Sequence, residues 1–122
     1  MAIDIVGVNR SYPAGADLSA LQYTFVKMSG TTVIAPTAAT DKVVGVLLNK
    51  PTSGRAATVA ITGVVKVVAS KAIAAGVPIY ITASGQATDT QAANVAVGIS
   101  ETASSGAGTI VSVLLKPLAA VA

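Results

Sequence analysis

The segment Ala57-Thr-Val-Ala-Ile-Thr-Gly63-Val-Val-Lys-Val-Val-Ala69 is a long run of residues that favour β-strands. Val, Ile and Thr are enriched in strands because their branched side chains pack well on a pleated surface. Positions 59, 61, 65 and 67 are all Val or Ile, so they share one face if the glycine does not shift the register. A glycine inside such a pattern favours a bulge or a sharp bend. This segment therefore predicts two strand pieces, 58–62 and 64–69, that meet at a bend such as a barrel corner.

The rest of the chain has the same character on both sides of this segment. Short apolar runs alternate with Gly, Pro, Ser and Asn, which are typical of turns. No segment carries a sustained helical period. The other candidate strands are residues 3–8, 22–28, 33–35, 43–49, 79–82, 95–100 and 109–115. We therefore expect an all-β fold, a small β-barrel or sandwich.

Four short patterns in the first half of the chain recur in the same order in the second half. The pairs are residues 25–30 and 80–85, 44–46 and 97–99, 53–54 and 105–106, and 58–61 and 109–113, at offsets of 55, 53, 52 and 51 residues. One such unit cannot bury both faces of its strands, whereas two can close into one barrel or sandwich. Chance similarity in a chain rich in Val, Ala and Gly is the alternative.

The repeat suggests how the chain is divided. We predict one β domain, residues 17–116, built from two tandem, similar units at about 22–69 and 77–116. An extended N-terminal arm, residues 1–16, would precede this domain, and a C-terminal tail, residues 117–122, would follow it.

The side-chain inventory leaves little for catalysis. The chain has no Cys and no His, which removes Ser-His-Asp, Cys-His and His-ligated zinc sites together. The five acidic residues are isolated in sequence, so solvated surface acids are favoured over a carboxylate pair assembled by the fold. Gly106-Ala-Gly108 begins like a dinucleotide-binding loop but lacks its third glycine and precedes a predicted strand. We therefore expect no enzyme activity, no cofactor and no metal site.

The composition favours a protein that is covered by other protein. Hydrophobic residues make up 52% of the chain and charged residues 11%, against about 25% charged residues in a typical soluble domain. A soluble monomer of this kind exposes large apolar patches unless copies of itself or a larger assembly cover them. A robust Ala-rich monomer is the alternative.

Two classes of partner are not expected. The longest apolar runs, such as residues 43–48 and 118–122, are far shorter than the roughly 18 residues of a membrane-spanning helix. The net charge of +3 is too small, and its lysines and arginines too scattered, to predict nucleic-acid binding. The sequence thus predicts neither a membrane nor a nucleic acid as partner.

Several phrases resemble a family of small head proteins of tailed bacteriophages. The most distinctive phrase is Asp41-Lys-Val-Val-Gly-Val-Leu-Leu-Asn-Lys-Pro51, and the resemblance covers roughly residues 15–116. The other matching phrases are residues 15–27, 54–59, 63–67, 73–76, 97–99 and 110–115. Members of the family are described as capsid decoration, cement or stabilisation proteins. The resemblance implies a β-rich protein, made in the host bacterial cytoplasm, that sits on the outer face of an icosahedral head as a symmetric oligomer.

From the resemblance we expect a structural virion protein that stabilises contacts between major capsid subunits. The expected partners are the major capsid protein and further copies of the chain, with a trimer favoured over a dimer. The candidate assembly contacts lie in the arm and the tail, unless both ends are merely frayed. They are Ile3, Ile5, Val6, Val8, Tyr12, Pro13, Pro117, Leu118 and Val121.

Two alternatives remain open. One is another virion component, such as a head fibre base or a tail part. The other is a β module that binds a small ligand or carbohydrate. The latter is disfavoured because such sites usually use aromatic platforms, and the chain has only three Tyr and one Phe.

Overall fold

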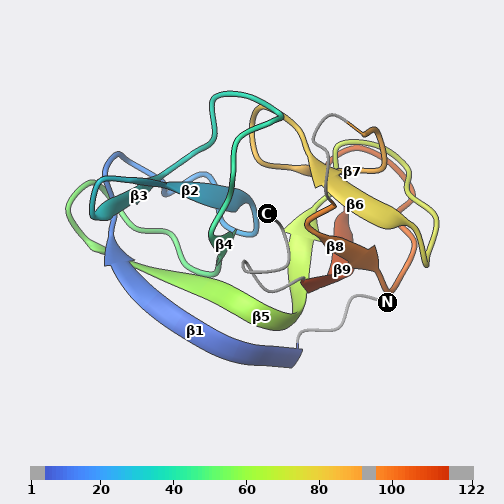
Figure 1. Cartoon of the computed structure of the whole chain (residues 1–122), viewed down its shortest axis with the longest axis horizontal. Helices are drawn as coiled ribbons and strands as arrows, with labels where there is room; N and C mark the ends of the chain where they lie inside the picture. Colours follow the sequence, from blue (N-terminus) through green and yellow to red (C-terminus); the bar gives the residue numbers. More distant parts are fainter. Residues whose placement is uncertain (1–4, 92–95, 116–122) are drawn as a thin grey trace.

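The computed structural model describes residues 5–91 and 96–115, and it confirms the predicted all-β fold (Figure 1). The described residues form nine strands and no helix. The strands are β1 (Ile5–Pro13), β2 (Phe25–Ser29), β3 (Thr32–Ile34), β4 (Gly45–Leu47), β5 (Ala56–Val68), β6 (Pro78–Ile81), β7 (Ala87–Thr88), β8 (Gly98–Ser100) and β9 (Ile110–Leu115).

Strand β5 is the element around which the others are arranged. The two strand pieces predicted on either side of Gly63 form one bent strand of 13 residues, and Gly63 has a φ of 102°. Strand β4 pairs with the first half of β5, and β9 pairs with its second half, both antiparallel. Strand β1 runs antiparallel along the other edge of β5, from Pro13 opposite Ala56 to Ile5 opposite Val64.

The strand order shows two tandem units of the same topology. The full order is β3-β2-β4-β5-β9-β8-β6-β7, with β1 paired to β5. The first half of the chain thus has the order β3-β2-β4-β5-β1, and the second half has the equivalent order β7-β6-β8-β9-β5. We define the N-terminal unit as β1–β4 with the first half of β5, residues 5–61. The C-terminal unit is the second half of β5 with β6–β9, within residues 64–91 and 96–115. The two units lie side by side as two lobes joined by β5 (Figure 1).

Each unit curls back towards its own first strand. In the N-terminal unit, Ala14, directly after β1, bridges to Val33 in β3. In the C-terminal unit, Ala69, directly after β5, bridges to Ala87 in β7. The second half of β5 therefore does for the C-terminal unit what β1 does for the N-terminal unit. The sheet is curled like a barrel, as predicted, but each unit curls on its own rather than the two units closing together into one barrel.

The main-chain hydrogen bonds place the repeat more accurately than the sequence patterns did. Gly54 and Gly108 both have a φ of 83°. The Gly54 N–H donates to Ala14 O and the Gly108 N–H to Ala69 O, both at 2.8 Å. Gly54 therefore corresponds to Gly108 and not to Gly106, which the sequence patterns had matched with it.

The predicted N-terminal arm differs from the structure in its described part. Residues 5–13 are a strand of the sheet, although residues 8–13 lack an alternating apolar pattern. Asn9, Arg10 and Ser11 are exposed, since β1 lies at an edge and its pairing depends on main-chain bonds to β5. Strand β7, which has only two residues, was also missed because it is too short for a pattern to form.

The hydrophobic core has two parts. One lies within the N-terminal unit and includes Leu18, Val33 and Val59. The other fills the C-terminal unit, but four of its buried residues come from the N-terminal unit. These four are Phe25, Val43, Val46 and Ala60. The two units are thus packed on each other through apolar side chains.

Candidate assembly surface

The structure places only some of the nine predicted contact residues. Ile5, Val6 and Val8 lie in β1, paired with Val64, Gly63 and Thr62 of β5. The backbone of this segment is therefore part of the protein's own sheet. The remaining predicted residues of the two chain ends, Ile3, Pro117, Leu118 and Val121, lie outside the described residues.

Tyr12 and Pro13 lie together at the end of β1 but have different surroundings. Tyr12 is half-buried and packs against the core of the N-terminal unit. The guanidinium carbon of Arg10 lies 5.6 Å from the centre of its ring, a cation–π distance. Pro13 is exposed. Tyr12 therefore serves its own unit, whereas Pro13 is open to a partner.

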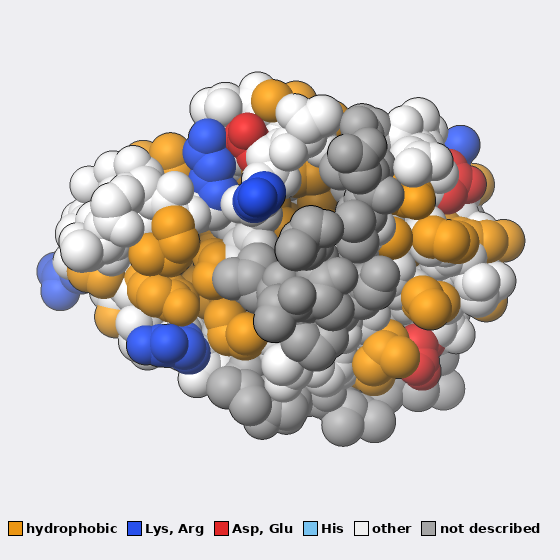
Figure 2. Space-filling view, in the orientation of Figure 1, with side chains coloured by type: hydrophobic (Ala, Val, Ile, Leu, Met, Phe, Trp, Pro, Cys, Tyr) orange, Lys and Arg blue, Asp and Glu red, His pale blue; other side chains and the backbone are white. Residues whose placement is uncertain are grey.

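The large apolar side chains that are exposed lie elsewhere. Among the described residues they are Met28 (40% exposed), Ile99 (47%) and Leu114 (44%). Ile99 in β8 pairs directly with Leu114 in β9, and with Pro78 in β6, which is also exposed. We call Pro78, Ile99 and Leu114 the exposed row, since they form an apolar line across three adjacent strands. Figure 2 shows hydrophobic side chains on the surface of both lobes.

The exposed row was not predicted from the sequence. The signal in the sequence is that residues 110–115 are apolar at almost every position, so that β9 presents apolar side chains on both faces. Val111, Val113 and Leu115 point into the core, and Leu114 points outward. A strand that is apolar on both faces is normally covered on both. Which face is open depends on the neighbouring strands and cannot be told from the strand alone.

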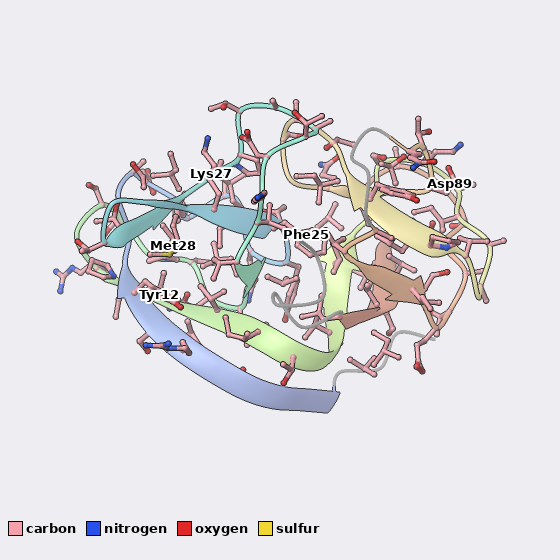
Figure 3. The ribbon with its side chains drawn as sticks, in the orientation of Figure 1. Tyr12, Phe25, Lys27, Met28 and Asp89 are labelled. Atoms are coloured by element: carbon pink, nitrogen blue, oxygen red, sulfur yellow. The ribbon has the colours of Figure 1, made fainter. Side chains whose placement is uncertain are left out.

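One carboxylate holds a surface loop in place. Asp41 forms an ion pair with Lys27 of β2 at 3.0 Å and accepts main-chain N–H bonds from Thr37 at 2.8 Å and Ala38 at 3.1 Å. The Thr37 bond, together with Lys27, lowers the pKa of Asp41 to about 2. Lys27 points from β2 towards this loop (Figure 3). The arrangement is a structural clamp, because every partner belongs to the loop or to β2.

The other polar groups in the described part also have structural roles. Lys71 and Asp89 form an ion pair at 2.9 Å on the C-terminal unit. The buried Ser100 hydroxyl donates to Ala74 O at 2.7 Å and accepts from the Val77 N–H at 3.1 Å, which ties the segment before β6 to β8. Within residues 5–91 and 96–115, no buried side-chain N or O lacks a partner.

Two further features are absent from the described ranges. These ranges hold no cluster of three Asp or Glu side chains suited to a metal ion. They also contain no helix long and apolar enough to cross a membrane.

The comparisons with known proteins agree with the architecture. A family model described as phage cement protein matches residues 19–116. A solved structure, the head fiber gp8.5 N base of bacteriophage phi29, has a similar fold with a TM-score of 0.69 at 16% sequence identity. The alignment covers 89% of this chain and 93% of that one. A search of curated proteins finds no significant match.

Proposed function

The chain belongs to the phage cement protein family, and on that basis we propose that it binds the outer surface of a phage head and stabilises contacts between major capsid subunits. A structural role in the virion follows from family membership, since the match covers residues 19–116. The attachment to the outer surface, synthesis in the host bacterial cytoplasm and the absence of catalysis are part of the proposal.

The single observation that carries the proposal is an exposed apolar surface on a fold whose described buried polar side chains all have partners. Ile99 and Leu114 are nearly half exposed on the sheet, while the described buried polar side chains have their partners within the chain. Exposed apolar side chains of this kind support contacts with other protein, either the shell or further copies of the chain. Repeated at each symmetry site of a shell, modest contacts sum to a large stabilisation.

The proposed partners are the major capsid protein and further copies of the chain. A trimer is favoured over a dimer, because shell positions with three-fold or quasi-three-fold symmetry match it. The chain ends, with Ile3, Pro117, Leu118 and Val121, remain proposed contacts with the shell. Pro13 is a predicted assembly contact whose exposure leaves it open to the shell or to a further copy.

Binding to heads tests this function directly. Purified protein is mixed with expanded and with unexpanded heads that lack it, and co-sedimentation measures the copies bound per head. Saturable binding to one or both kinds of head, at a number that fits a symmetry site, supports the proposal. Absence of binding to both contradicts it.

A second candidate is the base of a head fibre. The observation in its favour is the likeness to the phi29 structure, which at 16% identity concerns the fold alone. Cryo-electron microscopy of decorated heads separates the two functions. A cement protein gives density that bridges neighbouring capsid subunits, whereas a fibre base gives density attached at one site and projecting from the head.

A further inference from the structure

The exposed row has a counterpart in the N-terminal unit. Phe25 pairs with Val46, and Val46 pairs with Ala60, in the same register that joins the members of the exposed row. We call these three residues the buried row, since Phe25 is 1% exposed and Val46 and Ala60 are 0% exposed. They belong to the core of the C-terminal unit, and Phe25 lies at the junction between the lobes (Figure 3). Equivalent positions are therefore covered in one unit and open in the other.

Met28 in the N-terminal unit and Ile81 in the C-terminal unit show the complementary difference. Val26 pairs with Gly45 as Ile79 pairs with Gly98, so that Met28 and Ile81, two residues further on, are equivalent. Ile81 is 3% exposed and lies in the same core as the buried row. Met28 is 40% exposed and lies on the N-terminal unit, away from the junction (Figure 3). Ile81, which lies in the same core as the buried row, therefore has an exposed equivalent in Met28.

We propose that the exposed row of one molecule docks on the Met28 end of a second copy, head to tail, as the buried row docks on the C-terminal unit within the molecule. This arrangement covers all three large apolar side chains that the described residues expose. A contact between two different surfaces either closes into a ring or extends as a filament. The inference rests on the self-association included in the proposed function, and a closed ring of three copies satisfies it.

The contact between the two units within one molecule includes main-chain hydrogen bonds that the proposed contact between copies lacks. Within the molecule, the Val68 N–H donates to Tyr23 O and the Phe25 N–H donates to Gly85 O, both at 2.8 Å. Each bond joins one unit to the other. Together they fix the internal packing with directional contacts as well as apolar ones.

The residues equivalent to these two donors, Val68 and Phe25, are both proline in the other unit. Pro13 pairs with the first residue of β5 as Val68 pairs with the first residue of β9. Pro78 holds the place in the exposed row that Phe25 holds in the buried row. Proline has no N–H, so the contact between copies relies on side chains and is weaker than the internal one. Copies can therefore separate at low concentration.

Paired variants test this arrangement. Leu114→Asp spoils the exposed row, and Met28→Asp spoils the surface that receives it. We expect wild-type protein to associate with rising concentration in light scattering, and each variant alone to stay monomeric. An equimolar mixture of the two variants is expected to form a 1:1 dimer and nothing larger, since one intact contact remains. Ala107→Asp, at an exposed turn outside both surfaces, is the matched control and associates like wild type.

Two further variants guard against misfolding and test the proline argument. Ile99→Thr removes apolar area but keeps a strand-forming residue, and it is expected to weaken association with an unchanged circular dichroism spectrum. Pro13→Val restores one main-chain donor and is expected to tighten association by up to about tenfold.

The outcomes separate this inference from the proposed function. A monomeric wild type at all concentrations, or a variant mixture that stays monomeric, overturns head-to-tail docking even if heads are still bound. Association with the expected variant pattern, but without binding to heads, supports the docking and contradicts the cement function.

Discussion

At the scale of single residues, two glycines let neighbouring strands approach closely at equivalent positions. A methyl group on Gly98 would overlap the Leu114 carbonyl oxygen and lie 2.7 Å from Val113 Cγ1. A methyl group on Gly45 would overlap the Ala60 carbonyl oxygen and lie 2.9 Å from Val59 Cγ1. The Val-Gly-Val and Val-Gly-Ile phrases of the repeat therefore record one packing requirement that occurs twice.

Gly98→Ala is expected to lower the free energy of unfolding by about 1–3 kcal/mol, because the new methyl group meets backbone that cannot move aside cheaply. Urea denaturation followed by circular dichroism measures the change. Gly106→Ala is the control, since nothing lies within 4 Å of its added methyl group and its change should stay below about 0.5 kcal/mol. Equal effects of the two substitutions would contradict the packing argument.

Asp41 makes stability depend on pH in acid. Its pKa is lowered in the folded state to about 2, so its contribution is present above the ordinary carboxyl pKa and is lost as pH falls through about 2. We expect Asp41→Asn to be less stable than wild type at pH 5 and the difference to shrink at pH 2.5. Denaturant midpoints at both pH values measure it. A difference that is the same at both would show that Asp41 does not act through its charge.

At the scale of elements, the sequence predicted most strands but not how they are joined. Segments 22–28, 79–82 and 109–115 each contain or overlap a strand, because β-branched runs bounded by turn residues carry a local signal. The length of β1 and the joining of two pieces into β5 depend on pairing between distant segments, which no local pattern records. The exposed row was not predictable for the same reason, because the exposure of a side chain depends on which distant segments cover its strand.

The bend in β5 is expected to depend on Gly63. Its φ of 102° is one that residues with a side chain rarely adopt. Gly63→Ala should therefore cost about 1–3 kcal/mol of unfolding free energy, compared in urea with the same Gly106→Ala control. A cost no greater than that of the control would mean that the bend does not require glycine.

At the scale of the whole molecule, the two units should unfold together, because they share β5 and one of the two core clusters. Val59→Ala in the N-terminal core and Val113→Ala in the C-terminal core should each shift the entire transition by about 2 kcal/mol. Tyrosine fluorescence can report on each unit separately. In a Tyr80→Phe variant, Tyr12 and Tyr23 report on the N-terminal unit. In a variant with Tyr12→Phe and Tyr23→Phe, Tyr80 reports on the C-terminal unit. Two separate midpoints would contradict a single cooperative unit.

The arrangement of the whole molecule also accounts for the low proportion of charged residues. Among the described residues, the large exposed apolar side chains lie on two surfaces, Met28 on the N-terminal unit and Ile99 with Leu114 on the C-terminal unit. Terminal units of repeat proteins usually present a polar outer face, and an apolar one indicates that another protein covers it. The low charge content thus agrees with the assembly proposed above.

The most direct test of the cement function is the thermal rupture of heads. Heads that lack the protein are saturated with purified protein, heated, and monitored for release of DNA with a dye. We expect saturation with wild-type protein to raise the rupture temperature above that of heads without the protein. If protein binds but the rupture temperature is unchanged, the cement function is contradicted and only attachment to the head remains.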